Sequence, residues 1–131
     1  MKKTFAALLG FALLAPAGAA LAAECDLKLG EKMYKRCKAC HKLEDGKNGV
    51  GPHLFGIIDR AVAGVEGYKY SKGMQAYAEG GAVWDVARLD AFLIKPKNEV
   101  KGTKMSFAGI KKEEQRAALI CYLEKEAGVT E

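Results

Sequence analysis

Cys37-Lys38-Ala39-Cys40-His41 is the stretch that decides how this 131-residue chain folds. Two thiols stand three positions apart and an imidazole follows the second one directly, which is the sequence to which a c-type haem is attached. Each thiol would form a thioether with the haem, and His41 would reach the iron through one ring nitrogen. The pentapeptide therefore predicts one covalently held haem that the rest of the chain encloses.

Three other uses of the two thiols stay open on the residues alone. A structural zinc site needs four ligands, usually in two short pairs, whereas Cys25, His53 and Cys121 stand singly. A redox-active dithiol would sit at a helix start after a strand, but the preceding residues 29–36 have a helical pattern. A plain disulfide is the third alternative, and it gives His41 no role.

Residues 1–22 predict an export signal. Met1-Lys2-Lys3 is positively charged, residues 5–14 are apolar, and Ala20-Leu21-Ala22 has the pattern of a cleavage site. The apolar run is shorter than the roughly 20 residues that cross a bilayer. We expect cleavage after Ala22 or Ala23 and a soluble periplasmic protein, not an integral membrane protein.

The length predicts one domain over residues 24–131, and we expect it to be a monomer. Cleavage after Ala22 leaves 109 residues, which bury a modest core that an embedded haem would enlarge. It also removes two lysines and no acidic residue, so the formal charge falls from +5 to +3. No basic tract is interleaved with aromatic residues, which argues against a nucleic-acid partner.

Hydrophobic periodicity predicts an all-α fold. Gly80-Gly81 separates two short helices, and Pro96 stops the second of them. No stretch shows sustained strand alternation, so long loops should wrap around the haem. The predicted helices span residues 29–38, 71–79, 85–95 and 112–127.

Two cysteines, Cys25 and Cys121, are left over once the pentapeptide has taken its two thiols. In an oxidising compartment such cysteines usually pair with each other. We hypothesise a disulfide between Cys25 and Cys121, and two buried free thiols are the alternative.

The second axial ligand of the iron stays open on the residues alone. The candidates are His53, a methionine and an unfilled position. Met33 and Met74 lie in predicted helices and are expected to pack in the core. Met105 lies in the polar loop predicted over residues 97–105, where an apolar side chain needs a reason. Met105 is therefore a candidate ligand. The residues alone do not decide between it, His53 and an unfilled position.

Further motifs follow the pentapeptide in a characteristic order. Gly51-Pro52-His53-Leu54-Phe55-Gly56 comes next, Trp84 stands midway, and Gly-Thr-Lys-Met-Ser-Phe-Ala-Gly-Ile at residues 102–110 precedes the last helix. In this order the chain resembles class I cytochromes c, in particular the branch of bacterial cytochrome c2 and mitochondrial cytochrome c. The resemblance covers almost the whole mature chain. It implies a single all-α domain whose terminal helices cross and whose shorter helices and loops surround one covalent haem.

The resemblance also implies the ligands. His41 and Met105 would be the two axial ligands, and the carbonyl of Pro52 would accept the second ring proton of His41. His53 is then expected to face outward as a surface histidine.

Other matching residues would surround the haem or join the terminal helices. A buried propionate needs hydrogen-bond donors, because an unpaired buried charge is very costly. By resemblance these haem-environment positions are Arg60, Tyr68, Tyr70, Trp84 and Thr103. The contact between the terminal helices would involve Gly30, Tyr34, Leu119 and Tyr122.

Two departures from the family pattern stand out. Phe92 occupies a position where the family commonly has a tyrosine near the methionine sulfur, so one hydrogen bond to the ligand is missing. Residues 71–83 also differ, with Met74 near a commonly polar position and extra residues before Trp84.

The function implied is that of a one-electron carrier and not of an enzyme. Lysines around an exposed haem edge would guide brief docking of redox proteins. A membrane oxidase, a reductase complex, a photosynthetic reaction centre and an exported dehydrogenase all remain candidate partners. The basic positions that match the family are Arg36, Lys97, Lys104, Lys111 and Lys112.

Two rival functions stay open. A peroxidase-like enzyme or gas-binding haem protein would need an open sixth position, which requires that Met105 does not ligate the iron. An assembly or signalling protein could use the haem only as a structural core.

Overall fold

The first helix is capped at its N-terminus by the side chain of Asp26. The computed structural model describes residues 24–128, in which α1 spans Leu27–Tyr34. The backbone N–H of Leu29 donates to the carboxylate of Asp26 at 2.9 Å, which satisfies a free donor of the first turn. The predicted extension of this helix to residue 38 is wrong. Short-range bonds, such as that from Cys37 N–H to the Tyr34 carbonyl at 2.7 Å, tighten residues 35–40 into turns.

Three short helices follow a long stretch of loop. α2 spans Lys72–Tyr77 and α3 spans Val86–Ile94, close to the predicted bounds. The side chains of Ser71 and Asp85 cap their first turns. α4 spans Pro96–Glu99, so the prediction of a loop from residue 97 is wrong at its start. Pro96 ends α3 but also opens α4, since proline suits the first position of a helix.

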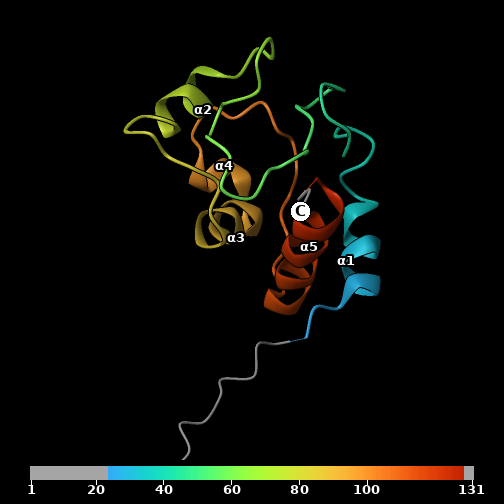
Figure 1. The fold of residues 1–131 in the computed structure, drawn as a ribbon. Helices are drawn as coiled ribbons and strands as arrows, with labels where there is room; N and C mark the ends of the chain where they lie inside the picture. Colours follow the sequence, from blue (N-terminus) through green and yellow to red (C-terminus); the bar gives the residue numbers. More distant parts are fainter. Residues whose placement is uncertain (1–23, 129–131) are drawn as a thin grey trace, which may run out of the picture.

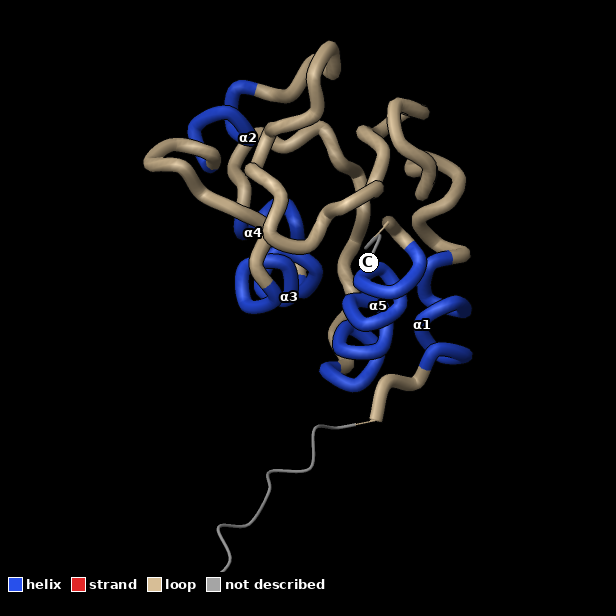
Figure 2. Tube along the Cα trace, viewed as in Figure 1, coloured by secondary structure: helices blue, strands red, loops and turns tan. Residues whose placement is uncertain are grey.

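The last helix, α5, spans Glu113–Glu126 and carries Glu113 and Glu114 in its first turn, where acidic side chains suit the helix dipole. Figure 1 shows α1 and α5 side by side, with α2, α3 and α4 grouped on the other side of the molecule. The loops of residues 35–71 connect the two groups, and the described residues contain no strand beyond an isolated bridge between Ala61 and Val83 (Figure 2). The predicted all-α fold is confirmed.

α1 packs closely on α5 because Gly30 has no side chain. A Cβ built at Gly30 would lie 2.5 Å from the Cβ of Tyr122 and would also meet the carbonyl of Ala118. Beside it the rings of Tyr34 and Tyr122 pack with centroids 5.7 Å apart, and Leu119 is completely buried. The contact that the resemblance implied between the terminal helices is confirmed.

The core continues from this contact to the other helices. Val100 and Ile110 are 1% exposed, and Met33 is buried in the same cluster, as its helical position predicted. The indole ring of Trp84 lies against the ring of Phe92, with centroids 5.0 Å apart. The core thus joins both groups of helices through residues from almost the whole described chain.

A buried arginine ties α5 to α3. The guanidinium of Arg116 donates to the carboxylate of Asp90 at 2.7 Å and to the carbonyls of Ile110 and Lys111 at 3.1 and 2.8 Å. A buried charge persists only where such partners satisfy it. The bonds fix the segment that enters α5.

A disulfide joins Cys25 to Cys121, with Cα atoms 5.9 Å apart and a sequence separation of 96. It links the start of α1 to the middle of α5 and so acts on the same contact as Gly30.

The export signal predicted over residues 1–22 lies outside the described residues. Over residues 24–128 no helix is both long and apolar enough to cross a bilayer.

Replacing Cys25 and Cys121 together by serine should lower the free energy of unfolding by about 2 kcal/mol, the low end of the usual range, because haem attachment already restrains the unfolded chain. Urea unfolding of the haem-loaded proteins measures the change. Lys32→Ser, an exposed substitution on α1, is the control and should shift the midpoint far less. Alkylation of two free thiols in the unmodified protein would contradict the bridge.

Candidate functional site

The ring of His41 is held by one hydrogen bond. Its Nδ1 lies 2.7 Å from the carbonyl oxygen of Pro52. Because a carbonyl can only accept, Nδ1 carries the proton, and Nε2 is left with a lone pair. A histidine that ligates a metal is oriented in the same way, through its second nitrogen. The predicted bond between His41 and Pro52 is therefore present.

Close contacts with neighbouring residues restrict the position of His41. A Cβ built at Gly51 would lie 2.7 Å from His41 Nδ1 and 2.9 Å from Nε2, so only a glycine fits beside the ring. The hydroxyl of Tyr34 donates to the carbonyl of His41 at 3.0 Å. α1 and the Gly51-Pro52 loop thus hold the residue from two sides.

Burial sets the protonation of the attachment segment. It lowers the pKa of His41, against the opposing effect of the Pro52 bond, so the imidazole is neutral at pH 7, the form that binds metals. Burial also raises the pKa of the Cys37 thiol to about 11. A redox-active dithiol needs a lowered thiol pKa instead, so this pair does not fit that alternative.

A zinc centre, another of these alternatives, also finds no fitting set of ligands. Between residues 24 and 128 no three His, Cys, Asp or Glu side chains come together in an arrangement that could hold a metal ion.

Met105 lies in a segment that packs against the attachment sequence. Its side chain is half-buried against the core, and its backbone N–H donates to the hydroxyl of Thr103 at 3.2 Å. The guanidinium of Arg36 lies 4.9 Å from the ring centroid of Phe107 and donates to the Gly109 carbonyl at 3.4 Å. The residue before the pentapeptide is thus joined to the segment that carries Met105.

The Arg60 side chain has one buried nitrogen that lacks a hydrogen-bond partner in the described residues. Its NH1 donates to the carbonyl of Phe55 at 2.7 Å and its NH2 to the carbonyl of His53 at 3.0 Å. Its Nε is buried and has no partner among residues 24–128. An orphaned buried donor of this kind fits an anionic group such as a carboxylate that the protein itself does not supply.

The aromatic residues predicted near the propionates have their own contacts. The hydroxyl of Tyr70 accepts from the N–H of Val65 at 3.1 Å, which leaves its hydrogen free to donate elsewhere. Tyr68 packs edge-on against Tyr70, with centroids 4.8 Å apart, and donates to the Val50 carbonyl at 2.8 Å. The hydroxyl hydrogen of Tyr70 is therefore still available, whereas the hydroxyl hydrogen of Tyr68 is already donated to the Val50 carbonyl.

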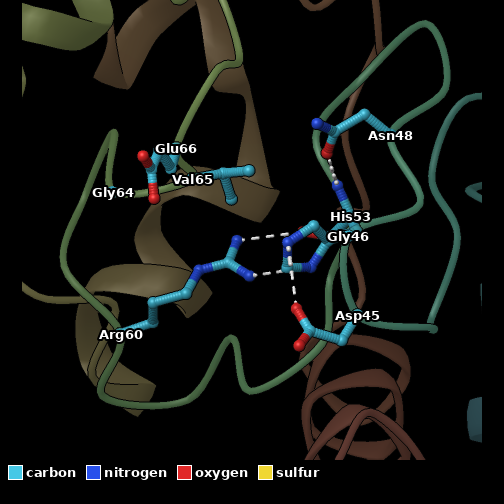
Figure 3. Close-up of a pocket in the computed structure, with 8 residues that line it drawn as sticks. All are labelled: Asp45, Gly46, Asn48, His53, Arg60, Gly64, Val65 and Glu66. Carbon is cyan, nitrogen blue, oxygen red and sulfur yellow. Dashed lines mark hydrogen bonds and ion pairs between the residues drawn. The ribbon is translucent and has the colours of Figure 1, made fainter.

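The prediction that His53 faces outward is wrong. The residue is only 8% exposed, and its ring lies between Arg60 and the carboxylate of Asp45 (Figure 3). Its backbone N–H donates to the side chain of Asn48 at 3.0 Å, which turns the loop inward. That expectation followed from the resemblance, which gave the iron ligation to His41 and Met105 and left His53 no role at the haem. The loop of residues 45–48 that covers His53 could not be predicted.

The predicted basic ring is exposed, and two of its members also make contacts within the chain. Arg36 packs on Phe107, and Lys104 Nζ donates to the carbonyl of Lys69 at 3.3 Å. The three with no such contact in the described chain are Lys97, Lys111 and Lys112.

The donor set fits a covalent haem. The fold joins the segments that carry the groups concerned. These groups are two thiols, a neutral imidazole with a free Nε2, a half-buried thioether and a guanidinium nitrogen without a partner in the described chain. Covalent attachment and iron ligation use these groups. The site defines a c-type haem protein of the all-α class.

The chain belongs to the Cytochrome c family, which matches residues 27–126. It is 46% identical over 101 residues to cytochrome c2 of Agrobacterium tumefaciens, covering 76% of this chain and 91% of that protein. It is 54% identical over 99 residues to the cytochrome c-type cyt cy of Rhodobacter capsulatus, covering 75% of this chain. Only 48% of that relative is matched, so the chain spans about half its length.

A solved structure agrees with the sequence matches. Cytochrome cH from Methylobacterium extorquens superimposes with a TM-score of 0.68 at 41% identity, covering 76% of this chain and 97% of that one. The resemblance to class I cytochromes c near the cytochrome c2 branch is confirmed. The cofactor of this family is one covalently bound c-type haem.

Three functional positions escaped prediction. Gly51 had no role assigned, although a glycine next to Pro52 in a motif that contacts His41 was a usable signal. The hydroxyl of Tyr34 on the His41 carbonyl and the carboxylate of Asp45 beside His53 left no signal in the sequence, because both depend on how loops close.

Replacing Gly51 by alanine should displace the His41 ring, because the added Cβ would overlap Nδ1 and Nε2. We expect a large loss of correctly ligated haem protein, measured as the visible spectrum and as the reduction potential. Val50→Ala, at the neighbouring residue that is 79% exposed, is the matched control and should behave as wild type. An unchanged potential in Gly51→Ala would contradict the proposed tight fit.

Proposed function

We propose that the protein is a soluble exported electron carrier in which Cys37 and Cys40 hold the haem and His41 and Met105 ligate its iron. The observation that carries this proposal is the bond between His41 Nδ1 and the Pro52 carbonyl, which fixes the ring and leaves Nε2 free. The assignment of Met105 as a ligand is supported by its half-buried side chain and by the packing of Arg36 on Phe107. This packing holds the segment of Met105 against the attachment segment.

The haem supplies a one-electron couple, and the chain keeps its surroundings fixed. The Pro52 bond and the close approach of the Gly51 backbone restrict rotation of the His41 ring. The bond from Met105 N–H to Thr103 stiffens the loop on the other side. Rigid ligands make little reorganisation necessary when one electron arrives or leaves. By this account Thr103 acts through Met105, and the free donors of Arg60 and Tyr70 serve the propionates.

Trp84 is the third donor that we assign to the propionate end. Its indole ring is 7% exposed and packs between Tyr77 and Phe92, with centroid separations of 5.9 and 5.0 Å. Within residues 24–128 its ring nitrogen makes no hydrogen bond, so that donor is left for a group outside the polypeptide.

Export rests on the signal pattern of residues 1–22 and on the cytochrome c2 relatives. We propose cleavage after Ala22 or Ala23 and a periplasmic location, in which the Cys25–Cys121 disulfide can form. The intact mass of the protein purified from the periplasm, with one haem added, tests both the cleavage and the bridge.

A peroxidase-like or gas-binding function is the alternative, and it requires an open position opposite His41. Replacing Met105 by alanine separates the two. The wild-type ferrous protein should not bind carbon monoxide, whereas Met105→Ala should bind it readily, lower the reduction potential and lose the red absorption band of methionine-ligated ferric haem.

The control for this experiment is Met74→Ala, since Met74 is the other half-buried methionine packed on the core. It should keep the absorption band and resist carbon monoxide. Carbon monoxide binding by the wild type at neutral pH would reject the carrier and favour the alternative.

Partner docking should use the exposed cations Arg36, Lys97, Lys104, Lys111 and Lys112. Partners of complementary charge, such as an oxidase, a reductase complex, a reaction centre or an exported dehydrogenase, associate faster through such a surface. No nucleic-acid partner is proposed, and the carrier acts as a monomer.

The rate of electron transfer to an acidic redox protein should fall as ionic strength rises, because salt screens exposed charges over about 10 Å at 0.1 M. Replacing Lys111 and Lys112 by glutamine should flatten this dependence. Lys28→Gln, an exposed lysine at the start of α1, is the control. A rate independent of salt would count against this surface.

A further inference from the structure

A second histidine, His53, lies beside Arg60, one of the proposed propionate donors, and the inference drawn from it rests on the proposed function. His53 faces a cavity of about 310 Å³ between the loop of residues 45–48 and the loop of residues 60–66. Figure 3 shows the His53 ring pointing at Arg60 from one side and at Asp45 from the other. The cavity is lined by Asp45, Gly46, Asn48, His53, Arg60, Gly64, Val65 and Glu66.

The contacts of His53 define where its proton sits. Arg60 NH1 lies 3.5 Å from His53 Nδ1, and an arginine can only donate, so Nδ1 must offer a lone pair. The proton of the neutral ring is then on Nε2, which faces Asp45 Oδ1 at 3.6 Å. A second proton at Nδ1 would remove the acceptor and set an imidazolium against the guanidinium. The proton on His53 and the contact from Arg60 therefore compete.

Arg60 connects this competition to the redox centre. The same guanidinium holds the His53 carbonyl through NH2 and the Phe55 carbonyl through NH1, while its buried Nε lacks a partner in the described chain. Under the proposed function, that Nε would be free to donate to a haem propionate. A change in charge at the haem and a change in charge at His53 thus act on one side chain between them.

We propose that His53 is the proton-linked residue of this electron carrier, taking up a proton when the protein is reduced and releasing it when the protein is oxidised. Reduction brings one electron from the donor protein, and the proton comes from water to Nδ1. Oxidation passes the electron to the acceptor protein and releases the proton to water. The electron makes the haem environment more negative, which favours the cationic imidazole and relieves the crowding of positive charge around Arg60.

The charges facing His53 determine where the effect falls on the pH scale. Burial lowers the pKa of His53 below its usual 6.5, and Arg60 lowers the pKa further, whereas Asp45 raises it. Glu66 is the remaining charged residue that lines the cavity. The lowered pKa means that the coupled proton is exchanged on the acid side of pH 6.5. There the potential should fall as pH rises, and above that region His53 is neutral in both states.

Proton titration of His53 by NMR in both redox states tests the coupling directly. The chain has two histidines, and His41 is the proposed iron ligand, so the titrating imidazole is unambiguous. We expect proton affinity about fivefold higher in the reduced protein, at the low end of typical coupling between sites. By linkage the potential should drop by ~40 mV across the titration, at ~59 mV per tenfold for one electron.

Variants assign this drop to His53. His53→Asn should abolish most of it, while the backbone bond to Asn48 is kept. Asp45→Asn should move the drop to lower pH, because Asp45 raises the pKa of His53. Glu66→Gln removes a charge from the same cavity and should leave the drop in place, which makes it the matched control.

Equal proton affinity of His53 in the two redox states would overturn the inference, as would a full drop in His53→Asn. Failure of the proposed function looks different. In that case the wild-type protein lacks the absorption band of methionine-ligated haem or binds carbon monoxide, and the NMR comparison still shows whether the proton on His53 follows the oxidation state.

Discussion

The close approach of α1 to α5 at Gly30 is the contact on which the rest of the structure depends. α1 leads directly into the attachment turns, so its position on α5 determines where the two thiols stand. Tyr34 extends this influence: its ring packs on Tyr122, and its hydroxyl donates to the His41 carbonyl at 3.0 Å. A side chain at residue 30 would therefore move His41, the proposed haem ligand, as well as the helix. The disulfide from Cys25 restrains the same contact.

Two partly or fully buried arginines show how structural and functional charges differ. Arg116 is 6% exposed, and its donors are occupied by the Asp90 carboxylate and two carbonyls, so it joins α5 to α3 and needs nothing more. Arg60 donates to two carbonyls as well, yet its Nε stays without a partner in the described chain. Leaving a buried donor unsatisfied costs about 1–3 kcal/mol. A cofactor carboxylate would recover that free energy, so the polypeptide alone does not complete its own hydrogen bonding.

Sequence reasoning predicted the elements that depend on local patterns and was wrong where distant loops meet. The four longer helices follow from periodicity and from caps such as Ser71 and Asp85. α4 was missed because Pro96 was interpreted only as a stop, although proline also opens helices. His53 was expected on the surface because the resemblance assigned the iron ligands to His41 and Met105 and left His53 without a role. Its burial comes from Asn48 and from Arg60, whose positions depend on loop closure.

The two histidines have different proposed roles at one redox site, since His41 ligates the iron and His53 exchanges a proton. His41 is fixed by a short bond to the Pro52 carbonyl and packs closely against the backbone of Gly51, so it cannot exchange its proton without losing its orientation. His53, one residue after Pro52, has weaker and opposed partners, with a guanidinium at 3.5 Å and a carboxylate at 3.6 Å. Competing charges leave its proton free to respond. A rigid ligand beside a responsive neighbour lets the iron keep its geometry while the surrounding charge adjusts to the electron.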